Sequence, residues 1–139
     1  MNGVELIAQE RQKQIEQDGW SANHDDAHDR FQLSDAAMAY LNPSNSDHIR
    51  RFWPWDWKWW KPARGNSIND RYEIYHIRDL VKAGALIAAE IDRLQRLNKK
   101  KANDGSHCTC DVQYWDNGNS LCYVCGLSKA TSVGRSPKG

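Results

Sequence analysis

The chain has 139 residues and carries 19 Lys and Arg against 18 Asp and Glu, a formal net charge of +1 at pH 7. This balance excludes a nucleic-acid scaffold held by bulk positive charge and an acidic, solvating tail. The mean hydropathy is −0.84, and no segment approaches the roughly 18 apolar residues that a membrane span needs. The first residues lack the basic and apolar regions of a secretory signal. We therefore expect a cytoplasmic protein with one domain and a small appendage.

The first helix is expected over residues 3–18. This segment contains no Pro, is rich in Glu, Gln and Arg, and is followed by Gly19, a residue that commonly ends helices. On a helical wheel, Arg11 interrupts one narrow apolar side, and Glu10 and Gln14 lie at its edge. The apolar positions on that side are Val4, Ile7, Ala8 and Ile15. Polar groups placed in this way are expected to face the polar groups of a partner or to line a site.

A loop, a second helix and an irregular segment are expected next. Residues 20–30 have the composition of a loop, in which Asp29 or Ser34 just beyond it can cap the following helix. Residues 32–41 place apolar side chains at helical spacing before Asn42-Pro43 stops the helix. Residues 43–70 contain three of the four prolines and the segment FWPWDWKWWKP. We expect an ordered but irregular, Trp-rich insertion there, because so many indole rings are seldom left in solvent.

The third and longest helix is expected over residues 69–100. Apolar residues recur at steps of three and four along it, and Gly84 permits the close approach of another helix. The wide apolar side around Ile87 needs more cover than two short helices supply. We therefore expect residues 1–101 to form a mainly helical bundle that is completed by a second copy, as a homodimer or higher homo-oligomer.

Four cysteines follow the long helix with the spacing C-x-C-x11-C-x2-C. In a chain without an export signal, clustered cysteines favour Zn²⁺ over disulfides. A four-sulfur zinc site is closed and structural, so we expect a zinc-knuckle-like module over residues 102–128 and a flexible tail over 129–139. The alternative is four thiols without a metal. The predicted zinc ligands are Cys108, Cys110, Cys122 and Cys125.

Two further groups of residues carry chemistry. The segment between the first two helices is dense in imidazoles and carboxylates that can hold a divalent ion or transfer protons, although such residues also simply begin helices. The indoles of the Trp-rich insertion alternate with lysines, so they can stack a base and meet a phosphate, or they can form a plug that covers the bundle. The candidate ligand-binding residues are Arg11, His24, Asp25, Asp26, His28, Trp57, Trp59, Trp60 and Lys61.

The motifs ER-x2-Q, GW-x3-HDD, WPW-x3-WWKP and LVKAGALIAAEIDRL resemble a family of small proteins of unassigned function from tailed phages and prophages. The resemblance covers roughly residues 4 to 97 and implies a protein that works in the cytoplasm of a bacterial host. The order of elements is also similar to that of MazG-like all-α nucleoside triphosphate pyrophosphohydrolases, which use Mg²⁺ held by E-E-x2-E and E-x2-D motifs. Here the candidate catalytic acids are Glu10, Asp35 and Glu90.

The number of acids decides between the functional hypotheses. Asp35 is the only acid of its helix, and Glu90 is not followed by an E-x2-D motif, although Mg²⁺ needs several hard oxygen ligands. We therefore expect a phage accessory protein that binds or sequesters a nucleotide, a nucleotide-derived signal or a host factor without catalysis, with a counter-defence role implied by phage origin. The alternative is a divergent Mg²⁺-dependent nucleoside triphosphate pyrophosphohydrolase that uses Glu10, Asp26, Asp35 and Glu90. A second alternative is an adaptor whose zinc module binds nucleic acid or protein.

The position of Glu90 raises a separate question. It falls within the apolar side of the long helix, where a carboxylate must be paired, bound to a metal or protonated. It is expected to be either half of a buried ion pair, with Arg11 or another arginine, or part of a ligand site.

Overall fold

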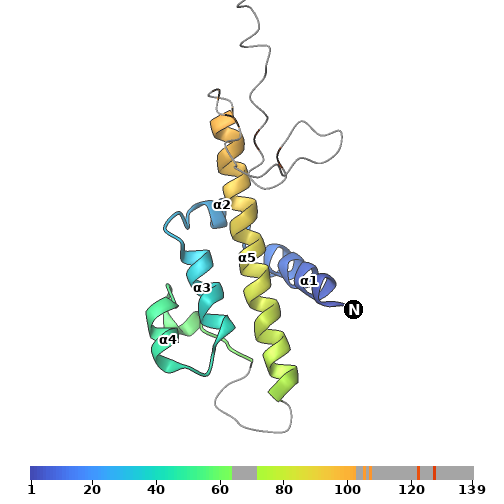
Figure 1. Cartoon of the computed structure of the whole chain (residues 1–139), viewed down its shortest axis with the longest axis vertical. Coiled ribbons are helices and arrows are strands. Elements are labelled where there is room, and N and C mark those ends of the chain that lie inside the picture. The colour runs from blue at the N-terminus through green and yellow to red at the C-terminus, as the bar shows by residue number, and fades with distance from the viewer. Residues whose placement is uncertain (64–71, 103–104, 106, 108–121, 123–126, 128–139) are drawn as a thin grey trace, which may run out of the picture. The chain divides into compact units, whose positions relative to one another are not determined.

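The structure is a computed structural model that describes residues 1–63, 72–102, 105, 107, 122 and 127 (Figure 1). Its elements are α1 (Gly3–Glu16), α2 (Ala22–Asp26), α3 (Gln32–Leu41), α4 (Ser46–Phe52), the short 3-10 helix η1 (Trp57–Trp59) and α5 (Tyr72–Ala102). These residues contain helices and no strand, which confirms the mainly helical fold. The chain divides into two compact units, residues 1–91 and residues 92–139. None of the described helices is long and apolar enough to cross a membrane.

Helix α1 begins with a capping box. The Asn2 side chain accepts a hydrogen bond from the Glu5 amide at 3.0 Å, and the Glu5 carboxylate accepts one from the Asn2 amide at 2.7 Å. The helix ends two residues before the predicted end, and Gly19 follows with a φ of +74°. The prediction of its extent is therefore confirmed to within two residues.

The buried side of α1 differs from the predicted apolar side. Val4 is 78% exposed and Ile15 is 41% exposed, whereas Gln14 is only 4% exposed. Glu10 and Arg11 are half-buried. Two of the four residues on the apolar side are therefore exposed, and the side of the helix that is buried is partly polar.

Helix α1 lies against the middle of α5 (Figure 1). A Cβ atom built on Gly84 would lie 2.6 Å from Ile7 Cδ1 and 2.8 Å from Ile7 Cγ1, far inside normal contact distance. The prediction that Gly84 permits the close approach of another helix is confirmed, and the side chain that uses the space is Ile7.

Two short helices replace predicted irregular structure. The prediction of a loop over residues 20–30 is wrong for α2, which starts where the Ser21 hydroxyl accepts a hydrogen bond from the His24 amide at 3.3 Å. The prediction of an irregular segment from residue 43 is wrong for α4, whose cap is the Asn45 side chain, accepting from the His48 amide at 3.1 Å. Both helices are shorter than two turns and have no apolar period of their own, so caps and tertiary contacts determine them.

Helix α3 spans the predicted residues 32–41 without change. Its start differs from the expectation, because neither Asp29 nor Ser34 caps it. Phe31 occupies the N-cap position in the left-handed region, with φ 65°, and makes no side-chain cap. The Gln32 side chain instead accepts a hydrogen bond from the Arg30 amide at 2.7 Å. Helices α3 and α4 pack against each other.

The core of the first unit joins alanines of α3 and α5 to the Trp-rich insertion. Trp53 is 8% exposed within this core, and Trp55 and Trp60 pack against it. These three indoles fit the interpretation of the insertion as a plug that covers the bundle. Trp57 and Trp59 of η1 are different, since they are 54% and 56% exposed. The buried core residues are Leu33, Ala36, Ala37, Ala39, Tyr40, Ile49, Trp53, Ala83, Leu86 and Ala89.

One side of α5 is apolar and exposed. Within the first unit, Ile74, Ile77, Ile87 and Ile91 are each 44–54% exposed. The prediction that the helix carries more apolar surface than its neighbours cover is confirmed for these residues. The dimer that we expect to cover this surface stays a prediction.

Candidate functional site

A cavity of about 730 Å³ lies within the first unit, between α1, α3, α5 and the Trp-rich insertion. Aromatic rings and charged side chains dominate its wall. The lining residues are Glu10, Lys13, Gln14, Asp18, Trp20, His24, His28, Tyr40, Trp53, Trp55, Asp56, Trp59, Lys61, Lys82 and Leu86. This is a volume and a composition typical of sites for small organic molecules.

One part of the aromatic wall comes from α2 and the turn before it. The rings of Trp20 and His24 are stacked, with centroids 5.3 Å apart and planes at 17°. His28 lies edge-on to His24 at 4.8 Å and against Trp55 at 5.2 Å. These contacts hold two imidazole rings and two indole rings in fixed orientations next to the cavity.

The other part of the aromatic wall comes from the insertion and α3. Trp53 lies edge-on to Trp55 at 5.3 Å and to Trp60 at 4.9 Å. Tyr40 lies 4.7 Å from Trp60, between ring centroids. The wall is therefore built from successive ring contacts, which keep the indoles in place without regular secondary structure.

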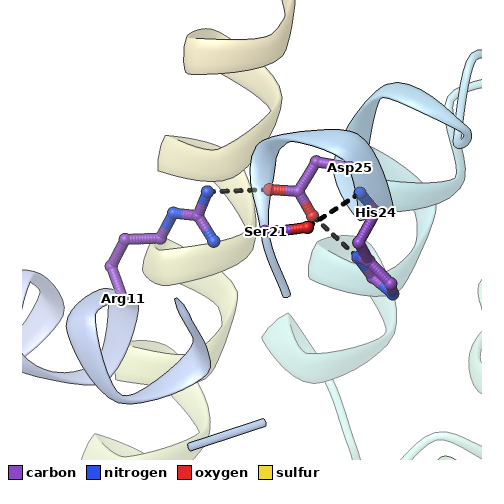
Figure 2. Close-up of polar contacts among 4 residues, drawn as sticks. All are labelled: Arg11, Ser21, His24 and Asp25. Atoms are coloured by element: carbon purple, nitrogen blue, oxygen red, sulfur yellow. Dashed lines mark hydrogen bonds and ion pairs between the residues drawn. The ribbon is translucent and has the colours of Figure 1, made fainter. Parts of the chain in front are cut away.

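Behind this wall, a buried ion pair connects α1 to α2 (Figure 2). The Arg11 guanidinium donates to Asp25 Oδ2 at 2.7 Å, and the two side chains are 11% and 0% exposed. The second oxygen of the same carboxylate, Oδ1, lies 3.0 Å from His24 Nδ1. Asp25 can be fully buried because Arg11 compensates its charge. The carboxylate in turn determines the orientation of the His24 ring at the cavity.

Lys82 of α5 connects the insertion to the long helix. Its ammonium donates to the Lys61 carbonyl oxygen at 2.6 Å and lies 5.5 Å from the centre of the Tyr40 ring. Burial lowers the pKa of Lys82, and burial raises the pKa of Tyr40 to about 12. A second link joins the Ala63 amide to Asp79 Oδ1 at 2.7 Å. The cavity thus contains a half-buried cation whose environment disfavours its charge.

Two buried polar atoms at the cavity wall make no hydrogen bond to any described residue. They are the amide oxygen of Gln14 and the indole nitrogen of Trp55. Leaving such an atom unpaired costs about 1–3 kcal/mol, so native structures rarely keep one without a reason. A bound molecule that pairs with these atoms would recover that free energy.

The structure brings together some of the predicted site residues and separates others. Five of them line the cavity: Glu10, His24, His28, Trp59 and Lys61. Arg11 and Asp25 are not among the lining residues but lie directly behind His24. The predicted residues that do not line the cavity are Asp26, Asp35, Trp57, Trp60 and Glu90. Glu90 is buried, as its position in the apolar side of the helix requires, with an exposed fraction of 6%.

Several lining residues are not among the predicted candidates. The helical spacing of Tyr40 indicates an inward position, and the residue is buried, but its ring also forms cavity wall. Lys82 lies four residues before Leu86 on the inward side of α5, and a lysine at such a position is a usable signal for a site. Gln14 gives the same kind of signal on α1. From the sequence, Trp53 and Trp55 can be recognised only as plug residues and Trp20 only as part of a loop.

No metal site is found in the part of the chain that the structure describes. Among those residues, no three His, Cys, Asp or Glu side chains come close enough to hold an ion. The acids of the hydrolase alternative, Glu10, Asp26, Asp35 and Glu90, are therefore not gathered into a ligand group.

The zinc prediction lies mostly outside the described residues, as do Cys108, Cys110 and Cys125. Of the four predicted ligands only Cys122 is described. It is buried, and its amide donates to the Leu127 carbonyl oxygen at 2.9 Å. Zinc binding by this segment stays a prediction.

Comparisons of the chain with protein-family models, curated proteins and solved structures found no match. The resemblance to phage proteins and to MazG-like enzymes therefore rests on the motifs alone.

Proposed function

We propose that the protein binds a nucleotide, or a molecule derived from one, in the cavity of the first unit. The observation that carries the proposal is the combination of an aromatic wall with three lysines, Lys13, Lys61 and Lys82, around a space of about 730 Å³. A nucleotide has the matching parts, because a planar base stacks on aromatic rings and its phosphates take cationic partners.

The aromatic wall supports the base half of the proposal. Trp59 is the most accessible of the indoles that line the cavity, with 56% of its surface exposed, and the ammonium groups of Lys58 and Lys61 lie 5.4 Å and 6.0 Å from its ring centre. A base that stacked on this ring would sit next to two cations. Stacking of a base on an aromatic side chain contributes about 1–3 kcal/mol.

Lys82 supports the phosphate half of the proposal. Its pKa is lowered chiefly by burial, and an anion placed beside it would relieve that penalty. The amine already has one hydrogen bond, to the Lys61 carbonyl oxygen, and an ammonium group has three donors. Donors therefore remain for a phosphate oxygen without loss of the link between the insertion and α5.

The test is a calorimetric titration of the full chain with the common nucleoside mono- and triphosphates. Trp59→Ala should weaken binding by roughly tenfold, as the loss of one stacking partner predicts. Trp57→Ala is a matched control, because Trp57 belongs to the same short helix, is equally exposed and does not line the cavity. Equal losses in the two variants, or no binding by the wild type, would contradict the proposal.

The hydrolase alternative is tested in the same samples. Pyrophosphate release is measured with and without Mg²⁺, and the proposal of binding without turnover expects none. The separation of Glu10, Asp26, Asp35 and Glu90 favours this outcome, because a Mg²⁺ site needs several oxygen ligands around one ion. The adaptor alternative predicts instead that the chain retards a nucleic acid in an electrophoretic shift assay.

We further propose that the protein acts as a homodimer and that the four cysteines hold a structural Zn²⁺. The exposed isoleucines of α5 support the first proposal, and the cysteine spacing supports the second. The role as a phage accessory protein that sequesters a nucleotide signal of the host rests on the motif resemblance.

A further inference from the structure

We infer that His24 selects the ligand, by accepting at its Nε2 atom a hydrogen bond from an exocyclic amino group of the base. The inference rests on the proposed function and adds to it a class of base. It predicts that the cavity prefers adenine, cytosine or guanine to otherwise equivalent bases that lack the amino group.

The Asp25 carboxylate is held by an arginine side chain. Asp25 is fully buried, and Arg11 donates to its Oδ2 atom at 2.7 Å. A guanidinium is always charged and is only a donor, so the carboxylate beside it is an acceptor. Asp25 Oδ1 can therefore only accept a hydrogen bond from its other partner.

The contact with Asp25 determines the tautomer of His24. Its Nδ1 atom lies 3.0 Å from Asp25 Oδ1, so the proton of the neutral imidazole must be on Nδ1 and Nε2 must be an acceptor. Figure 2 shows the far end of the ring directed away from Asp25. Within the described residues Nε2 makes no hydrogen bond, and the His24 ring belongs to the cavity wall.

Ring contacts keep the His24 acceptor in a fixed orientation. The His24 ring is stacked on Trp20 and meets the edge of His28, so it cannot turn away without loss of both contacts and the bond to Asp25. Gln14 differs, because its amide can present oxygen or nitrogen by rotation about its last bond. His24 is thus an acceptor in the wall whose hydrogen-bonding role is determined by its surroundings.

The consequence is a requirement on the ligand. A base that places an amino group at Nε2 pairs with it, whereas a base with an oxo group there presents a second acceptor. A site with an acceptor for a ligand's donor group rejects analogues that lack this group, because the acceptor of the site is then left unpaired. We expect a preference of roughly tenfold to a hundredfold for the amino-bearing base.

The experiment compares nucleotides that differ in the amino group, at pH 8. The pairs are ATP with purine riboside triphosphate, CTP with pyrimidin-2-one riboside triphosphate, and GTP with ITP. The amino-bearing member should bind roughly tenfold or more tightly in the pair that contains the tightest ligand. Equal affinities within that pair, or tightest binding by UTP or ITP, overturn the inference and leave the proposed function standing. No binding by any nucleotide overturns both.

Variants separate recognition by His24 from a general effect of the wall. His24→Phe keeps a ring against Trp20 but has no acceptor, so both members of the pair should still bind and their ratio should fall to near one. His48→Phe is the control, because His48 belongs to α4 and does not line the cavity, and it should keep the wild-type ratio. If His24→Phe keeps the wild-type ratio while it still binds, another residue reads the base and the inference is wrong.

Discussion

The contact between Gly84 and Ile7 determines how closely α1 approaches α5, so Gly84→Ala is the sharpest perturbation of the fold. In an open helix position, this change stabilises a protein by about 1 kcal/mol, because Gly is a poor helix former. Here the added methyl group would lie 2.6 Å from Ile7 Cδ1, 2.8 Å from Cγ1 and 3.4 Å from Cγ2. Cδ1 and Cγ1 would have to move, whereas Cγ2 is at ordinary contact distance. Because Cγ1 is one of the two, a rotation of the side-chain tip is not enough.

The expected change in the free energy of unfolding is the cost of the clash with Ile7 minus the gain in helix propensity. Overpacking of this kind costs about 1–3 kcal/mol, and the upper part of that range applies because both Cγ1 and Cδ1 of Ile7 would be displaced. After the gain of about 1 kcal/mol in helix propensity, the net loss in the free energy of unfolding is about 1–2 kcal/mol. Because α1 contributes Glu10 and Gln14 to the cavity wall, its displacement should also weaken nucleotide binding.

A double-mutant cycle tests this reasoning. The free energies of unfolding of the wild type, Gly84→Ala, Ile7→Ala and the double variant are measured in urea at one protein concentration. With Ile7 truncated the methyl group has room, so Gly84→Ala should then stabilise by about 1 kcal/mol rather than destabilise. If Gly84→Ala stabilises the wild-type background by the same amount, α1 and α5 do not approach each other as closely as the Gly84–Ile7 distances require.

Three further predictions concern other parts of the chain. The pKa of Tyr40 is raised to about 12 by burial, above its ordinary value near 10, so the folded state holds this proton more tightly than the unfolded state. The contribution of Tyr40 to the free energy of unfolding is therefore present below pH 10, and about 2–3 kcal/mol of it is lost between pH 10 and 12. In urea unfolding measurements, Tyr40→Phe should not show this loss. Ile87→Glu should convert a dimer into a monomer, and light scattering that gives the wild type a mass of 16.0 kDa at micromolar concentration would refute the dimer. Protein purified without chelator should contain one Zn²⁺ per chain, and Cys122→Ser should abolish it and expose residues 107–127 to protease while the helical unit stays folded.

The elements that the sequence predicts well are those with a long apolar period. Helix α3 has its apolar residues at helical spacing and a Pro stop, and its bounds are as predicted. Helix α5 differs only at its ends. The sequence does not predict α2 and α4, because helices of one or two turns are too short to show a periodic pattern of apolar residues. Their formation depends on the Ser21 and Asn45 caps and on tertiary contacts, above all the burial of Asp25 against Arg11 from another helix.

The candidate site is predictable in part. Composition alone singles out His24, His28, Trp59 and Lys61, since imidazoles and interleaved indoles and lysines suit a binding site. It cannot separate Trp59 from Trp57, because which of two neighbouring indoles faces a cavity depends on the turn of η1. The contributions of Tyr40 and Lys82 are also hidden, because separate segments of the chain meet to enclose the space.

Whether the cavity binds a nucleotide can be read from the indole N–H signals in a two-dimensional ¹⁵N–¹H NMR spectrum. Each tryptophan gives one such signal, and single Trp→Phe variants assign them. On addition of the tightest-binding nucleotide, we expect shifts for the signals of the four lining indoles and none for that of Trp57. The lining indoles are Trp20, Trp53, Trp55 and Trp59. Signals that stay in place at saturating nucleotide, or a shift confined to Trp57, would show that the cavity does not bind the nucleotide.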